Sequence, residues 1–147
     1  MPLLRSTPVA GPEDVARLRR ELLKLDAWAF WAVELEPASG ASFAVLGVTG
    51  AFAVAACGLE GYMVVEGRRF LVDGRAIGGF RDVKRAAKVL RGRLIAIGSA
   101  NTDVTPAIVL TRAAAGAPRE RGGVRVLRLE DVVRTVHGVG YALEVAP

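Results

Sequence analysis

The sequence has few of the side chains that hold metals or form cross-links. Its 147 residues include one histidine and one cysteine, Cys57. A single cysteine cannot form an internal disulfide, and one His with one distant Cys is not a zinc ligand set. Cys57 lies in an apolar stretch, so we expect a buried, inert thiol. Walker, nucleophile-elbow and dinucleotide-binding motifs are also missing, and we expect no cofactor and no bound metal.

Long apolar segments are missing too. The longest run, residues 41–58, is interrupted by Gly and Thr and is shorter than the roughly 20 residues that a membrane helix needs. The first residues, MPLLRSTPVAGPED, have too short an apolar core and too many prolines for a signal peptide. We therefore expect no membrane partner and a cytoplasmic location.

The composition that remains is typical of one folded domain. Hydrophobic residues make up 52% and charged residues 24% of the chain, which favours a globular protein over a disordered one. The net charge of +5 comes from 17 Arg and 3 Lys against 15 acidic residues. This balance permits anionic partners, but abundant Arg, Ala and Gly are also typical of GC-rich coding sequences.

The centre of the chain is an apolar hairpin, Ser42 to Cys57, which reads SFAVLGVTGAFAVAAC. Its run of Phe, Val, Leu and Ala is broken only by Gly47 and by Thr49-Gly50. This pattern predicts two strands that are buried on both faces and joined by a tight turn.

Other elements are expected on both sides of this hairpin. We expect a mobile arm at residues 1–11, a domain over residues 12–140 and a tail at residues 141–147. The expected elements within the domain are a helix from Pro12 to about Leu25, strands at 28–35, 62–65 and 68–72, a helix at 80–91, a strand at 104–110, a loop at 111–123, a strand at 124–127 and a helix from Leu129. The fold class is α/β, a single domain with a mixed β-sheet flanked by helices.

Cations gather on one face of the second long helix. They recur at spacings of three and four residues, opposite an apolar stripe. The residues are Arg81, Lys84, Arg85, Lys88 and Arg91, and Arg68 and Arg69 precede them on a hairpin. These seven are the candidate nucleic-acid-binding residues, through contacts with the phosphates of DNA or RNA. The alternative is a solvated helix face with no ligand.

The sequence resembles the nuclease-related domain (NERD) family, a branch of the restriction-endonuclease-like PD-(D/E)xK superfamily. The resemblance covers about residues 11–138. It rests on Gly11-Pro12-Glu13 before the first helix, on FAVLGVTGAFAV (43–54), on Gly61 followed by VVEGRRFLVDGR (64–75), and on the basic helix, VTPAIVL (104–110) and GVRVLRLEDVV (123–133). It implies a restriction-endonuclease-like sheet whose central hairpin carries a nuclease's metal ligands.

The positions that carry catalysis in this family are occupied by other residues here. Active members have an Asp, usually followed by His, where this chain has Ser42 and Phe43. They have an acidic residue and a Lys two apart where this chain has Ala55 and Cys57. The family's helix glutamine has no counterpart, because the chain contains no Gln, and Glu13 is the one acid that remains. Mg²⁺ requires oxygen ligands that Ala55 and Cys57 do not offer.

Three functions follow as hypotheses. The first is a catalytically inactive NERD-like domain that binds nucleic acid. The second is a protein-interaction or scaffold subunit, including a homo-oligomer, suggested by the apolar central region. The third is a metal-dependent nuclease with a displaced site, in which Glu13, Glu34, Glu60 or Glu66 supplies the carboxylates. An enzyme is the least favoured of the three.

Overall fold

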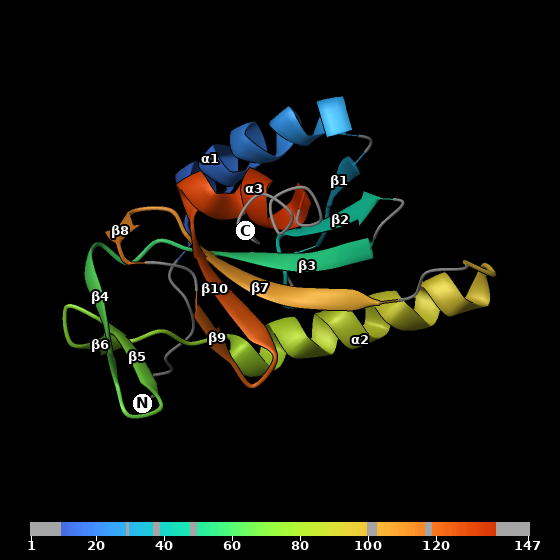
Figure 1. Cartoon of the computed structure of the whole chain (residues 1–147). Helices are drawn as coiled ribbons and strands as arrows, with labels where there is room; N and C mark the ends of the chain where they lie inside the picture. The colour runs from blue at the N-terminus through green and yellow to red at the C-terminus, as the bar shows by residue number, and fades with distance from the viewer. Residues whose placement is uncertain are drawn as a thin grey trace, which may run out of the picture.

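The computed structural model describes residues 10–28, 30–36, 39–47, 50–99, 103–116 and 119–137. The expected tail, 141–147, and most of the expected N-terminal arm lie outside these residues. The remainder folds into two β-sheets and three α-helices, with the larger sheet at the centre (Figure 1).

The larger sheet has six strands in the order β1-β2-β3-β7-β10-β9. They are β1 (Phe30–Glu34), β2 (Phe43–Gly47), β3 (Gly50–Cys57), β7 (Val104–Leu110), β10 (Val124–Arg128) and β9 (Arg119–Arg121). The central pairs β3·β7 and β7·β10 are parallel, whereas β1·β2, β2·β3 and β10·β9 are antiparallel. The expected mixed sheet is therefore confirmed.

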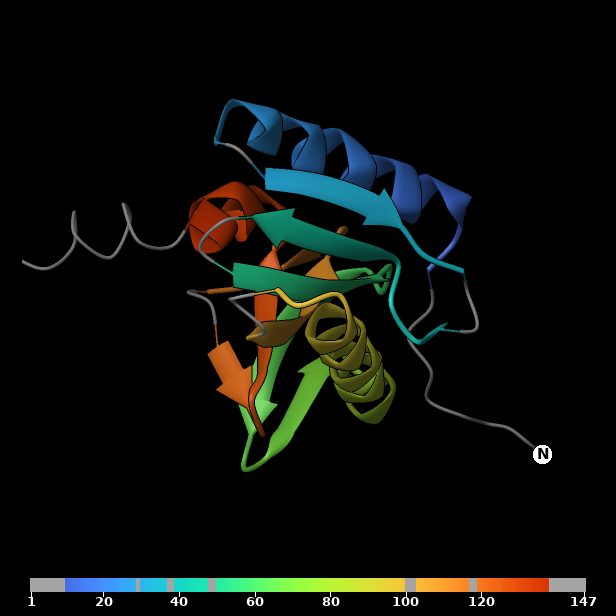
Figure 2. The ribbon, with the colours of Figure 1, turned by 90° about the vertical axis from the view of Figure 1, so that its right-hand side faces the viewer.

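A smaller sheet lies beside the larger one in the order β6-β5-β4-β8. It consists of β6 (Arg75–Ala76), β5 (Arg69–Val72), β4 (Gly61–Glu66) and β8 (Ala113–Ala114). The β4–β5 hairpin projects from the body of the molecule (Figures 1 and 2).

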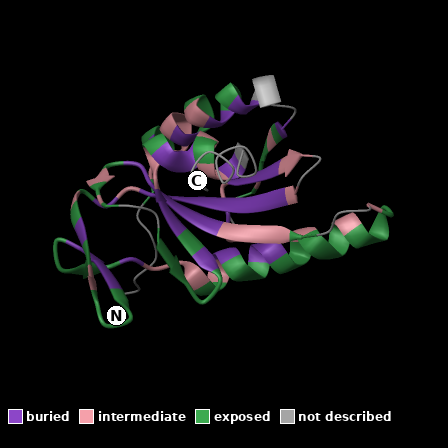
Figure 3. Cartoon of the chain, in the orientation of Figure 1, coloured by how far each residue is buried: buried purple, intermediate pink, exposed green. Residues whose placement is uncertain are grey.

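Helices cover both faces of the larger sheet. The helical elements are α1 (Pro12–Leu22) with the 3-10 segment η1 (Leu23–Trp28), α2 (Phe80–Ala96), and η3 (Leu129–Asp131) leading into α3 (Val132–His137). The helices α1 and α3 lie on one face and α2 on the other (Figure 1). Each face has its own buried cluster, one with Leu18, Leu22 and Phe43, the other with Val83, Ala87 and Ile108. Figure 3 shows β3 buried along its length between them.

The predicted central hairpin is confirmed as β2 and β3. Seven of the eight β3 residues are buried, because the strand is covered by helices on both faces. Gly47 pairs with Phe30, and a Cβ at position 47 would collide with the Phe30 ring. The absence of a side chain at Gly47 thus lets the Phe30 ring pack over the hairpin.

Several predicted boundaries were wrong. The residues 23–28 continue α1 as a 3-10 helix, so the first strand begins at Phe30. The helix α2 extends to Ala96, five residues beyond the predicted end. The segment 111–123, expected as a loop, contains the short strands β8 and β9. Strands of two and three residues have too few positions to show an alternating pattern in the sequence.

Candidate functional site

The three positions at which the resemblance predicts lost catalytic groups lie at one end of the β2–β3 hairpin, but they do not share one cavity. The Ser42 N–H donates to the Val54 carbonyl at 2.7 Å, and the Ser42 hydroxyl accepts a hydrogen bond from the Ala56 N–H at 3.3 Å. Ser42 and Ala55 line a cavity of about 420 Å³. Cys57, two residues beyond Ala55, is fully buried and does not reach this cavity.

Two carboxylates line the same cavity, and each is held by an arginine. The Glu34 carboxylate lies 2.6 Å from the Arg19 guanidinium, and the Asp82 carboxylate lies 3.3 Å from that of Arg85. Among the residues that the structure describes, no three His, Cys, Asp or Glu side chains form a group that could hold a metal ion.

A buried ionic network occupies the neighbouring ends of β3 and β7, and its central residue is Asp14. The Asp14 side chain is 3% exposed. It accepts hydrogen bonds from the Gly11 N–H at 2.9 Å, the Thr111 hydroxyl at 2.8 Å and the Arg112 Nε at 2.7 Å. The Thr111 N–H also donates to the Cys57 carbonyl at 3.0 Å. The network therefore ties α1 to the ends of both central strands.

The pKa of Asp14 lies below its usual value. Burial raises this pKa, but the hydrogen bonds from Gly11, Thr111 and Arg112, together with the positive charge of Arg112, outweigh it. Asp14 is therefore an ionised, fully engaged carboxylate.

Glu13 and Glu60, two of the acids considered for a displaced site, also contact Arg112. Their carboxylates lie 3.3 Å and 3.6 Å from its guanidinium, with the side chains 70% and 74% exposed. The two acids thus converge, but on a cation that already neutralises Asp14. Glu13 does not line the cavity at Ser42 and Ala55.

The Cys57 thiol shares this environment. Burial raises the pKa of Cys57, and the Asp14 carboxylate raises it further. A buried thiol of this kind is a poor nucleophile at neutral pH.

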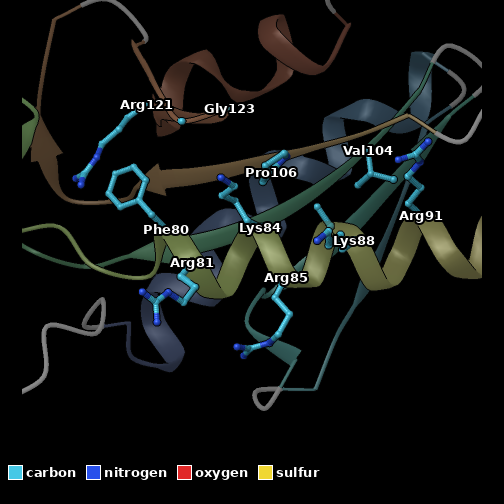
Figure 4. A pocket seen from close by; sticks show the side chains of 12 residues that line it. Phe80, Arg81, Lys84, Arg85, Lys88, Arg91, Val104, Pro106, Arg121 and Gly123 are labelled. Atoms are coloured by element: carbon cyan, nitrogen blue, oxygen red, sulfur yellow. The ribbon is translucent and has the colours of Figure 1, made fainter.

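The second candidate region is a groove of about 710 Å³ along α2. Six of its twelve lining residues are cations and none is acidic: Phe80, Arg81, Lys84, Arg85, Ala87, Lys88, Arg91, Val104, Pro106, Arg121, Gly122 and Gly123. All five helix cations predicted from the sequence are exposed and line this groove. Figure 4 shows Lys84 and Arg91 reaching from α2 toward β7, while Arg85 points outward.

Most of these cations have no counterion among the residues that the structure describes. Arg85 pairs with Asp82 at 3.3 Å. Within the part of the chain that the structure describes, Arg81, Lys84, Lys88 and Arg91 make no ion pair. A row of unpaired cations in a concave surface concentrates positive potential there.

The groove's other wall is the β9–β10 turn, which was not expected from the sequence. Gly122 and Gly123 both have positive φ, 58° and 85°, as a two-residue hairpin turn of the primed type requires. The turn carries Arg121, whose guanidinium lies 4.8 Å from the centroid of the Phe80 ring. The Gly-Gly pair after a polar segment was the available signal for this turn.

Arg68 and Arg69, also predicted to bind nucleic acid, are placed elsewhere. Both are exposed on the β4–β5 hairpin, and neither lines the groove. The predicted set of seven cations therefore divides into five on the groove and two outside it.

Comparison with known proteins does not assign this chain to a family. No protein-family model, curated protein or solved structure matches it. None of the described helices is long and apolar enough to cross a membrane. The function must therefore be argued from the geometry of the two regions.

Proposed function

We propose that this chain is a catalytically inactive, NERD-like domain that binds the phosphate backbone of DNA or RNA in the groove along α2. The observation that carries this proposal is the composition of the groove, with six cations and no carboxylate among its lining residues. Phosphate contacts by Arg and Lys release condensed counterions, which drives association without sequence specificity.

The order of helices and strands supports the proposal that the domain is NERD-like. The order expected with the resemblance is a buried hairpin, a second hairpin, a long helix and a strand, and β2–β3, β4–β5, α2 and β7 follow one another in this order. β7 pairs in parallel with β3 along seven residues. A shared fold does not choose a function, so the site must do so.

The residues at the three positions where the resemblance expects catalytic groups support the proposed lack of nuclease activity. Hydrolysis of a phosphodiester on this architecture needs carboxylates that hold Mg²⁺ and orient water. Ser42 supplies one hydroxyl, which already accepts from Ala56 N–H, and Ala55 and Cys57 supply no oxygen ligand. The buried carboxylate of Asp14 is neutralised by Arg112 at 2.7 Å.

The proposal is tested by titrating labelled single-stranded DNA, single-stranded RNA and duplex DNA with the protein at increasing KCl. We expect binding at low salt, with log K falling by about 0.7 per log unit of salt for each single-strand phosphate contacted. No binding at low salt, or binding that is indifferent to salt, would overturn it. Incubation with Mg²⁺ or Mn²⁺ in the same mixtures should leave the strands intact. Metal-dependent cleavage would instead support the hypothesis of a nuclease with a displaced site.

We propose self-association through β1 as a second candidate function. β1 is an edge strand, and alternate residues Trp31 and Val33 are 59% and 48% exposed on one of its faces. A second copy of β1 could pair with this edge in antiparallel fashion and cover the two side chains.

Sedimentation equilibrium over a range of protein concentrations tests this second candidate. We expect a dimer in the wild type and a monomer in Val33→Lys, because a charge on the covered face would be desolvated. A wild-type monomer at all concentrations would exclude self-association and leave the nucleic-acid proposal untouched.

A further inference from the structure

We infer that the groove selects single-stranded nucleic acid, by stacking one unpaired base against the Phe80 ring. This inference rests on the proposed function, since the phosphates of the same strand are held by the α2 cations. It adds the class of nucleic acid and names the residue that recognises it.

The groove combines two kinds of surface. Its cations stand on α2 and on the β9–β10 turn, whereas Phe80, Ala87, Val104 and Pro106 give it apolar area. Proteins that bind single strands combine a positively charged groove for the backbone with aromatic side chains for the bases. A groove that contacted only phosphates would have no use for apolar lining.

Phe80 is held at one end of this groove in a fixed orientation. It is the first residue of α2, and its ring packs against Phe70 of β5 at a centroid distance of 5.8 Å and an interplanar angle of 61°. This edge contact with a buried ring anchors Phe80, which still lines the groove. Figure 4 shows the Phe80 ring between α2 and Arg121.

The Arg121 guanidinium covers the Phe80 ring at 4.8 Å in the free protein. A cation and a nucleobase use the same electron-rich face of an aromatic ring. An incoming base therefore displaces the guanidinium, which remains within the groove and is free to pair with the phosphate next to that base. The guanidinium thus occupies the face of the Phe80 ring before binding, and the base occupies the same face after binding.

Duplex nucleic acid cannot make the same contact. The bases of a duplex are stacked on one another inside the helix, and their faces are not accessible to a ring at the protein surface. The α2 cations from Arg81 to Arg91 extend over a helix rise of about 15 Å, which suits a short stretch of one backbone. The protein should bind duplex through phosphates alone.

The experiment compares three labelled ligands of equal phosphate number at one salt concentration: oligothymidylate, an abasic strand and a duplex. In the wild type we expect oligothymidylate to bind about tenfold more tightly than the abasic strand, from stacking of one base. Phe80→Leu should remove this difference and leave the abasic affinity unchanged. Phe80→Tyr should retain the difference.

Tyr62→Leu is the matched control, because it removes an exposed aromatic ring that does not line the groove, and it should leave the difference between the two strands unchanged. Thermal unfolding of each variant establishes that it is folded. Equal affinity of wild type for thymidylate and abasic strand would overturn the stacking inference while leaving phosphate binding intact. Failure of all three ligands to bind would instead overturn the proposed function.

Discussion

At the carboxyl ends of β3 and β7 the charged side chains pair with opposite charges, whereas four of the α2 cations that line the groove have no ion pair within the described part of the chain. Arg112 alone contacts Asp14, Glu13 and Glu60. In the described part of the chain, Arg81, Lys84, Lys88 and Arg91 lie on one groove without ion pairs. The first region is a closed network, and the second has unused capacity for an anion.

The difference teaches which region is the candidate site. A buried ion pair whose hydrogen bonds are all made belongs to the folded core, and it has no polar atom left to bind a ligand. Neighbouring like charges repel one another and destabilise the compact state, unless an anionic partner compensates them. The closed network therefore offers no group to a ligand, and the groove along α2 is the candidate site.

The largest expected effect comes from reversing charge in the groove. Lys84→Glu with Lys88→Glu should weaken binding of a short single strand by about a hundredfold at moderate salt, since phosphate contacts are lost and repulsion is added. Fluorescence anisotropy measures the change. The matched control, Arg17→Glu with Arg20→Glu, alters net charge equally on α1, across the sheet from the groove (Figure 1). Equal losses in both variants would mean that net charge, and not the groove, controls binding.

The next largest effect should appear in stability and not in binding. Asp14→Ala leaves the buried partners of Asp14 without an acceptor, and we expect the free energy of unfolding to fall by about 3 kcal/mol. Urea denaturation followed by circular dichroism measures it. Glu13→Ala, at an exposed contact of the same arginine, should change it by about 0.5 kcal/mol or less. If the two variants were equally destabilised, Asp14 would not be the centre of the network.

The network should also make stability depend on acid. Since the pKa of Asp14 is lower in the folded chain than the value of about 3.9 in unfolded chains, the unfolded chain binds the proton more readily. The contribution of Asp14 is therefore complete above that pH and is lost as the pH falls through the lower, folded-state pKa. Denaturation midpoints in a series of acidic buffers should fall more steeply for wild type than for Asp14→Asn. Parallel curves would contradict this assignment.

The smallest effect concerns Cys57, whose thiol should not react with an alkylating reagent in the native protein. Because the thiol is buried and its pKa is raised, iodoacetamide should modify it only after unfolding. Mass spectrometry with and without urea measures the modification. Rapid labelling of the native chain would show that the end of β3 is open to solvent.

The sequence predicted the parts of the molecule with long, regular patterns. The hairpin 43–57 and the cation face of α2 could be read directly, because continuous apolar runs and spacings of three and four are unambiguous over many residues. Asp14 lies in the first turn of the helix predicted from Pro12, and no local pattern marks it as the centre of a buried network. Its role depends on Thr111 and Arg112, which lie about a hundred positions away and carry no local signal. Arg121 was missed for the same reason, since its position depends on the fold of a short turn.

The parallel pairing of β3 with β7 has a consequence for how the molecule forms. These strands are joined by a connection that contains β4, β5, β6 and α2, so the centre of the sheet closes only after a long loop has been ordered. Such long-range pairing makes folding slower than in proteins dominated by local contacts. The helix that carries the cations lies inside that loop, and the groove needs β7 and the β9–β10 turn as its far wall. A nascent or partly folded chain therefore carries the charges without the groove, and gains the complete surface only when the fold is complete.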